Sequence, residues 1–287
     1  MSMEMRTAYW DDRESRDAFQ RFILDIHNLD FAAWEAAGFW DDAYTPFTWF
    51  QDGEVISSVC IYSLPAVIDG RETKVAQISG VGTLPEYRRC GLNRELTAAG
   101  LKWAGEEHEG VYLFSDEDAI PFYAHCGFTA VDEHLPTMAL EPVQKITGAV
   151  QVDLDKKMDL DRVYGYARST AAISRQFAVG NPKLFMFHAM YTLRDTIWEV
   201  PDLGCLVCFR RKGDTLMIYH ILGESIPSFH RLYPFIAAET DRRVEFHFHA
   251  DQVAPGAAGR RELFGNNLFV RPDFPVKEPV FPFTSRA

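Results

Sequence analysis

Apolar residues in the first part of the chain recur first at helical spacing and then in the pattern of strands. A helix is predicted over 12–26, where the apolar face repeats with the period of a helix. A capping box formed by Asp11 and Glu14 indicates its start. Residues 47–64 are predicted to form a β-hairpin, because the Asp-Gly pair at 52–53 separates two apolar runs. A helix is therefore followed by antiparallel strands.

The stretch 75–96 predicts a strand, a turn and a helix in succession. Its first part is small, apolar and β-prone, and it stops at Pro85, which cannot donate to a ladder. Apolar residues then recur at helical spacing from Leu92, after a turn that carries arginines and Gly91. The amides at a helix start point outward, and the helix dipole favours negative charge there. The stretch therefore predicts a cradle for a phosphate.

Two motifs give this cradle a family resemblance. The turn matches neither the GxxxxGK[ST] loop of nucleotide hydrolases nor the GxGxxG of dinucleotide folds. Residues 88–93, Arg-Arg-Cys-Gly-Leu-Asn, resemble motif A of the GNAT acetyltransferases, R/Q-x-x-G-x-G/A, with Asn93 in place of the small last residue. Residues 116–128 resemble motif B, Asn-x-x-Ala-x-x-x-Tyr-x-x-x-Gly-Phe, with Asp116 where Asn is usual. The apolar run 111–114 before motif B is predicted to be a strand parallel to the one that ends near residue 84.

The resemblance implies an α/β (α+β) GNAT fold, a mixed and mostly antiparallel sheet flanked by helices, with acetyl-CoA as cofactor. It implies that Tyr123 is the catalytic acid that protonates the leaving thiolate of coenzyme A. A packing role for a half-buried Tyr123 is the alternative interpretation. The resemblance assigns the cofactor to Val81, Gly82, Thr83, Arg88, Arg89, Cys90, Gly91, Leu92, Asn93, Arg94, Asp116 and Ala119.

The aromatic segment 31–47 borders the acceptor cleft in this fold, so Trp40, Asp41 and Tyr44 are the candidate substrate-binding residues. Core packing is the favoured interpretation for Trp34, Phe39 and Trp40, because large aromatic side chains are readily buried. The general base stays open. The candidates are Asp116, Glu117, Asp41, Asp42 and a water chain; in the Eis-like relatives a terminal carboxylate has been assigned this role, and the resemblance does not carry it to Ala287.

The second half repeats the order of strands and helices without residue-level repetition. We interpret it as a second, degenerate GNAT-like domain, in a tandem arrangement similar to the Eis-like acetyltransferases, with domains at 1–142 and 143–287. Where a phosphate loop is required, the chain has Gly-Glu-Ser-Ile-Pro at 223–227, so we expect no acetyl-CoA there. Cys205 and Cys208 lie in an apolar strand without a partner pair, so we interpret them as buried thiols and expect no metal. The segment 263–287 suggests a strand and an extended tail.

Composition narrows the partners. The 287 residues suit two domains, and 47% hydrophobic and 14% aromatic residues suffice for packed cores. A net charge of −12 argues against nucleic acid and acidic membranes, which require basic surfaces. The charged start of the chain lacks the apolar core of a signal peptide, no window is long enough for a membrane span, and the five cysteines suit reduced thiols, so we expect a cytoplasmic protein.

The sequence therefore predicts an N-acetyltransferase that transfers an acetyl group from acetyl-CoA to a primary amine of a small molecule or a protein. The alternative is an acetyl-CoA sensor or interaction module with little turnover. Retention of Tyr123 favours the enzyme, because a sensor does not require an acid. The identity of the amine, the length of the acyl group and self-association through the aromatic segments stay open.

Overall fold

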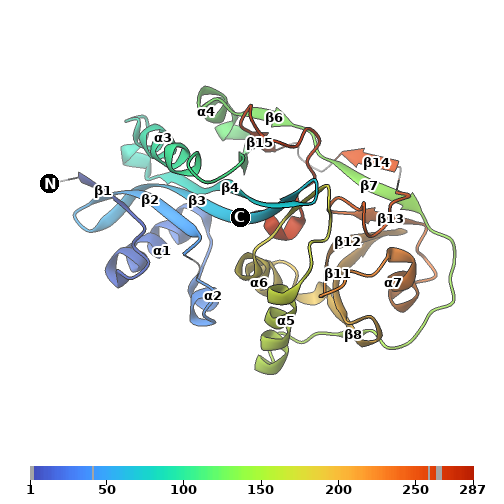
Figure 1. Ribbon diagram of the computed structural model, residues 1–287. Helices are drawn as coiled ribbons and strands as arrows, with labels where there is room; N and C mark the ends of the chain where they lie inside the picture. Colours follow the sequence, from blue (N-terminus) through green and yellow to red (C-terminus); the bar gives the residue numbers. More distant parts are fainter. Residues whose placement is uncertain (1–2, 41, 258, 263–266) are drawn as a thin grey trace.

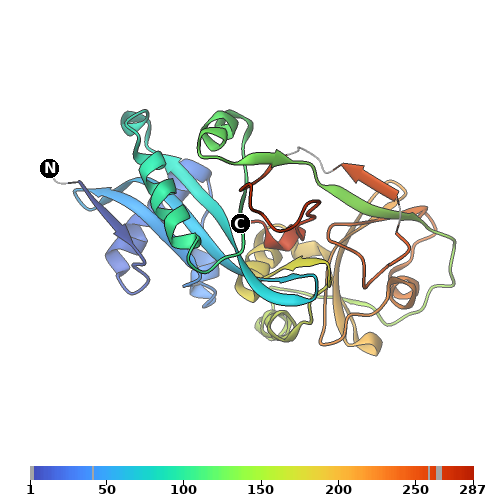
Figure 2. The same ribbon diagram turned by 45° about the horizontal axis from the view of Figure 1, so that its top comes forward.

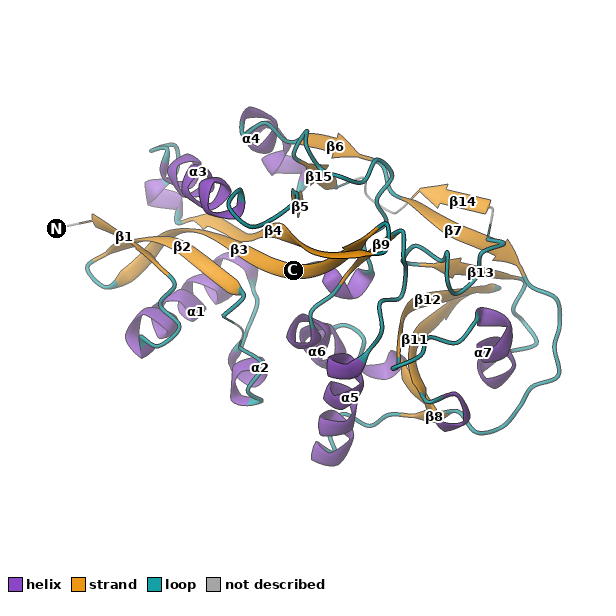
Figure 3. Ribbon diagram, viewed as in Figure 1, coloured by secondary structure: helices purple, strands orange, loops and turns teal. Residues whose placement is uncertain are grey.

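The computed structural model describes residues 3–40, 42–257, 259–262 and 267–287, which form two sheets side by side (Figures 1 and 3). In the described residues the first sheet runs β1-β2-β3-β4-β5-β15-β6, with β9 paired to β3, and the second runs β14-β7-β13-β12-β11-β10-β8. The first sheet is mostly antiparallel, and its central pair β4 and β5 is parallel. Its strands are β1 (Met3–Thr7), β2 (Tyr44–Gln51), β3 (Glu54–Ile68), β4 (Arg71–Thr83), β5 (Val111–Phe114), β6 (Thr129–Val131), β9 (Phe177–Val179) and β15 (Leu268–Val270).

Helices cover both faces of the first sheet. The helices α1 (Arg13–His27) and α2 (Ala32–Ala36) lie on one face, and α3 (Leu92–Ala104) lies on the other (Figures 1 and 2). The helix α1 is capped by Asp12 rather than by Asp11 as predicted, because the Asp12 carboxylate accepts hydrogen bonds from the amides of Glu14 and Ser15. The helix α4 (Ile120–His125) follows β5, as motif B predicts.

The parallel strands β4 and β5 separate at their carboxyl ends. They pair only from Ala76 with Val111 to Ile78 with Leu113, while β4 continues to Thr83. Directly beyond the paired part, β4 is irregular against β3 and Gly80 has a φ of 55°. A Cβ at Gly80 would lie 2.7 Å from the Tyr44 hydroxyl, so only glycine fits without displacing that ring. The bulge therefore opens a crevice at the place where ligands bind in parallel sheets.

The second sheet has the same plan around the parallel pair β12 and β13. The predicted strands and helices at 150–154, 160–173, 204–210, 216–222, 228–238 and 244–249 correspond to β8, α5, β11, β12, α7 and β13, with shifted ends. The strands of this sheet are β7 (His134–Ala139), β8 (Val150–Gln151), β10 (Ile197–Val200), β11 (Cys205–Lys212), β12 (Thr215–Leu222), β13 (Arg243–Phe246) and β14 (Gly259–Glu262), and the helices of this half are α5 (Lys157–Ser169), α6 (Pro182–Tyr191) and α7 (Phe229–Ile236). Of the helices in the described ranges, none is long and apolar enough to cross a membrane.

The two sheets exchange strands. The strand β7, from the first half of the chain, pairs with β13 and β14 of the second sheet. In return β15, from the end of the chain, inserts between β5 and β6 of the first sheet (Figure 3). The division at 1–142 and 143–287 stays a prediction, and strands cross it in both directions. The predicted strand in the tail is β15; residues 263–266, which belong to the same prediction, lie outside the described residues.

The cores follow this interlocking. One cluster of buried residues contains Phe19 and Phe50 from the first half together with Phe185 and Leu206 from the second. Cys205 and Cys208 are both fully buried on β11, in different clusters, which confirms the prediction of buried thiols. The two halves therefore share much of their apolar interior.

Candidate functional site

The residues of the predicted anion cradle lie at the start of α3. Gly91 caps the helix with a φ of 86°, and Arg89 also lies in the left-handed region with a φ of 66°. No side chain of the described residues caps this end, so the first amides of α3 are available to an outside acceptor. Arg88 is fixed in the turn, because its Nε donates to the Thr83 carbonyl over 3.1 Å. Amides, arginines and the helix dipole here all favour negative charge.

Asn93 takes part in a hydrogen-bond network with the sheet. Its Oδ1 accepts a hydrogen bond of 2.6 Å from the hydroxyl of Ser57 on β3. The same hydroxyl lies 3.0 Å from that of Thr83, and it is fully buried. The larger side chain at this motif position is therefore held towards β3 and the end of β4.

The cradle opens into a cleft of about 880 Å³ between the end of β4, the start of α3 and α4. Of the predicted cofactor residues, only Ala119 is missing from its lining, and Ala119 lines the adjoining cavity described next. The sequence therefore places these residues in one connected space. Those that line the cleft are Val81, Gly82, Thr83, Arg88, Arg89, Cys90, Gly91, Leu92, Asn93, Arg94 and Asp116.

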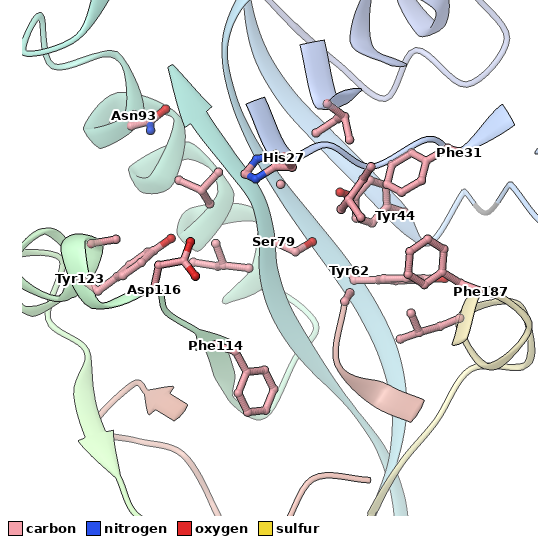
Figure 4. Close-up of a pocket in the computed structure, with 18 of the residues that line it drawn as sticks. His27, Phe31, Tyr44, Tyr62, Ser79, Asn93, Phe114, Asp116, Tyr123 and Phe187 are labelled. Atoms are coloured by element: carbon pink, nitrogen blue, oxygen red, sulfur yellow. The ribbon is translucent and has the colours of Figure 1, made fainter. Parts of the chain in front are cut away.

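A second cavity, of about 440 Å³, lies on the side of the crevice where α1, α2 and α6 meet (Figure 4). We call it the aromatic cavity. It shares His27, Val81, Asn93, Asp116 and Phe122 with the cleft, so the two spaces meet at the gap between β4 and β5. Most of its wall is apolar or aromatic, with side chains from α1, the α2 region, β2, β3, β5, α4 and α6.

Tyr123 lies at this junction. Its side chain is only 5% exposed, and it points from α4 towards the part of the aromatic cavity where Asp116 lies (Figure 4). Burial, together with the nearby Cys126 and Asp116, raises the pKa of Tyr123 well above its ordinary value. The phenol is therefore protonated at neutral pH and has a proton to donate.

His27 is a site residue that the sequence interpretation missed. It occupies the last turn of α1 and lines both spaces. Burial lowers the pKa of His27, while Asp116 opposes that shift. Its Nε2 is buried and has no hydrogen-bond partner among the described residues. Little in the sequence indicates this position, because the predicted helix ends at residue 26 and His27 follows it.

The predicted substrate-binding residues do not all line the aromatic cavity. Tyr44 lines the aromatic cavity. Trp40 is not part of the lining; it packs behind Tyr44, with ring centroids 6.3 Å apart. Asp41 lies outside the described residues. Trp34 and Phe39 are buried as core packing predicts, and Trp34 also reaches the cavity wall.

The tail of the chain reaches the same place. The side-chain amide of Gln77, fully buried on β4, donates to the Ala287 carbonyl over 2.9 Å and accepts from the Ala287 amide over 3.0 Å. Tyr112 donates to the Gln77 side chain and lies equally close to the Ser285 carbonyl. The buried pair of Arg286 and Glu133 holds the tail from the other side at 2.9 Å. Ala287 thereby forms part of the aromatic cavity wall.

Residues 3–128 match the sequence model of the acetyltransferase (GNAT) family. A sequence comparison with curated proteins found no match. The sequence motifs, the crevice and the strand topology therefore all agree with the GNAT fold. The chain has the GNAT fold, in a tandem arrangement similar to that of the Eis-like acetyltransferases.

Solved structures show the likeness of the whole chain. A protein of unknown function from Enterococcus faecalis V583, described as a probable N-acyltransferase, has a TM-score of 0.62 at 15% identity, covering 96% of this chain and 75% of that chain. Eis1 from Mycobacterium abscessus has a TM-score of 0.57 at 16% identity, with 94% and 73% covered. A GCN5-related N-acetyltransferase from Anabaena variabilis ATCC 29413 has a TM-score of 0.57 at 15% identity, with 94% and 73% covered. At these identities the likeness concerns the fold.

Proposed function

We propose that the protein transfers an acetyl group from acetyl-CoA to a primary amine. The observation that carries this proposal is the meeting of an anion-binding cleft and an aromatic cavity at the gap between β4 and β5, with Tyr123 at the junction. One space suits a phosphate-bearing donor and the other an acceptor. The family match over 3–128 supports the acyl-transfer class.

The residues present fit coenzyme A. The uncapped start of α3 offers backbone amides, and Arg88, Arg89 and Arg94 add positive charge beside them. These groups would hold the pyrophosphate. The unpaired end of β4, from Val81 to Thr83, offers backbone groups along which the pantetheine arm would lie. Bound acetyl-CoA supplies the activated thioester.

Tyr123 would act as the general acid. Departure of a thiolate is easier when a proton is delivered to the sulfur, and a buried phenol whose pKa is raised stays protonated until that moment. Tyr123 also borders the junction where the thioester would meet the amine.

His27 would act as the general base that takes a proton from the amine. Its lowered pKa leaves the imidazole neutral at pH 7, and its unpartnered Nε2 is available to accept. Of the carboxylates considered from the sequence, Asp116 lines the junction, whereas Glu117 and Asp42 line neither space. Asp116 would then attract the ammonium form of the substrate amine and orient it for proton transfer to His27.

The test is thiol release from acetyl-CoA over a panel of primary amines, with Tyr123→Phe beside the parent. We expect kcat to fall by roughly 10²–10⁴-fold, the usual contribution of a general acid, while calorimetry shows an unchanged Kd for acetyl-CoA. For His27→Gln we expect loss of the acidic limb of the pH profile, which in the parent lies below pH 6.5 because the pKa is lowered. Tight cofactor binding without turnover on any amine would support a sensor and overturn the enzyme.

A further inference from the structure

We propose that the acceptor is a small primary amine with one positive charge and an apolar, aromatic-sized body, and that α6 of the second half selects it. This inference rests on the proposed function, because it assigns the aromatic cavity to the acceptor. It narrows that function to one substrate class and gives the degenerate half a role in specificity.

The size of the aromatic cavity suits a small molecule. Its volume of about 440 Å³ falls within the ~300–1,000 Å³ typical of small-molecule sites. Aromatic rings form much of its wall and come from both halves of the chain (Figure 4). Such a lining stabilises a flat apolar body through edge and stacking contacts. The rings that carry this argument are those of Phe31, Trp34, Tyr44, Tyr62, Phe114 and Phe187.

The charge of the cavity suits a single ammonium group. Among the described residues that line it, Asp116 is the only acidic side chain and His27 the only basic one. Both lie at the junction with the cleft, where the reacting amine has to be placed. A polyamine or an aminoglycoside would bring further ammonium groups against apolar walls, and an unpaired buried charge is costly. The lining therefore favours an amine whose remaining part carries no charge.

The wall formed by α6 is fixed in place. Trp34 Nε1 donates to the Lys183 carbonyl over 2.9 Å, and Lys183 Nζ donates to the Trp40 carbonyl over 3.1 Å. Phe187 then packs its ring 5.8 Å from that of Phe31 and presents it to the cavity. The second half thus contributes one side of the acceptor space.

The first arm of the test compares acceptors at saturating acetyl-CoA. We use 2-phenylethylamine and tryptamine against spermidine, kanamycin and a lysine-containing peptide. We expect kcat/KM for the aryl amines to exceed that for the other probes by at least about 10-fold, the scale on which pocket contacts discriminate. Equal rates across the panel, or a preference for spermidine, kanamycin or the peptide, overturn the inference and leave the acetyltransferase function standing.

The second arm changes the wall. Phe187→Trp narrows the cavity, so we expect KM for 2-phenylethylamine to rise by about 10-fold with the Kd for acetyl-CoA unchanged. Phe187→Ala should extend the range to bulkier amines. The matched control is Phe209→Trp on β11, an aromatic residue of the second half that lines neither space and should leave KM unaltered. An unchanged KM in Phe187→Trp, or an equal rise in the control, contradicts a selecting role for α6.

Direct calorimetry separates this inference from the function on which it rests. If no amine is acetylated, the proposed function fails, yet 2-phenylethylamine should still bind the protein and lose affinity in Phe187→Trp. Absence of that binding overturns the inference as well.

Discussion

The two halves each contain a parallel strand pair, and the residues that follow the two pairs differ. In the first half β4 parts from β5 at a glycine bulge and is followed by an arginine-rich turn. In the second half the ring of Tyr219, directly beyond the pair β12 and β13, packs 4.8 Å from the ring of His247. The Gly223 amide, directly after β12, donates a hydrogen bond of 3.0 Å to the Thr170 hydroxyl, and Glu224 follows it in the chain. Topology alone therefore does not make a ligand site; the residues after the strand do.

Two buried histidines of the second half, His188 on α6 and His220 on β12, should make the protein sensitive to acid. Burial lowers the pKa of His188 and of His220 to about 4. Between about pH 6.5 and 4 the unfolded chain therefore binds more protons than the folded one, so the free energy of unfolding falls as the pH falls through this window. The loss approaches about 3 kcal/mol for each ring.

Urea unfolding at several pH values checks this expectation. His188→Gln cannot be protonated, so its dependence on pH should be flatter than that of the parent. The exposed His230, changed to Gln, is the matched control and should keep the parent slope. A parent curve that is flat over the window, or a variant as steep as the parent, would show that these rings do not stay neutral in the fold.

Two glycines with a positive φ, Gly91 in the first half and Gly204 in the second, allow a matched test of the predicted cradle. Gly91→Ala places a Cβ at a φ of 86° and disturbs the first amides of α3. Gly204→Ala places a Cβ at a φ of 61°, directly before β11. Both should lose on the order of 1 kcal/mol of stability. Only Gly91→Ala should weaken acetyl-CoA binding, by roughly 3–10-fold if one or two amide contacts are misplaced. An equal effect of both variants on the Kd, measured by calorimetry, would contradict a cradle at Gly91.

Asn93 offers the smallest effect. Its side chain is held by Ser57, so removing it in Asn93→Gly should change the Kd for acetyl-CoA by less than about 3-fold, within the worth of one hydrogen bond. A tenfold gain in affinity would instead show that the side chain obstructs the pyrophosphate. Asn93→Ala, measured alongside, separates loss of the side chain from the added flexibility of glycine.

Local features of the site were predictable from the sequence. Strand, turn and helix around Gly91, and the short helix that carries Tyr123, follow from apolar spacing, from Pro85 and from glycine positions, all of which act over a few residues. The turn and the start of α3 are formed by residues close together in the sequence, so a local pattern was sufficient to predict them.

Other features depend on contacts that no local pattern encodes. The strand β15 has three described residues, and its place between β5 and β6 results from pairing over more than a hundred residues of chain. The wall that Phe187 forms depends on α6 meeting α2, and nothing in the apolar run of α6 points to that partner. His27 became visible as a candidate base only in the fold, where burial lowers its pKa against the opposing effect of Asp116.

The exchange of β7 and β15 also sets the order in which parts of the fold can form during synthesis. As residues leave the ribosome, β5 and β6 have no strand between them until residues 268–270 have been made. The segment that bears Tyr123 lies between those two strands, so its surroundings in the sheet stay incomplete until residues 268–270 have been made. Pairing of such long range is slow and leaves strand edges exposed meanwhile. The first sheet is therefore completed only after the described strands of the second sheet have been made.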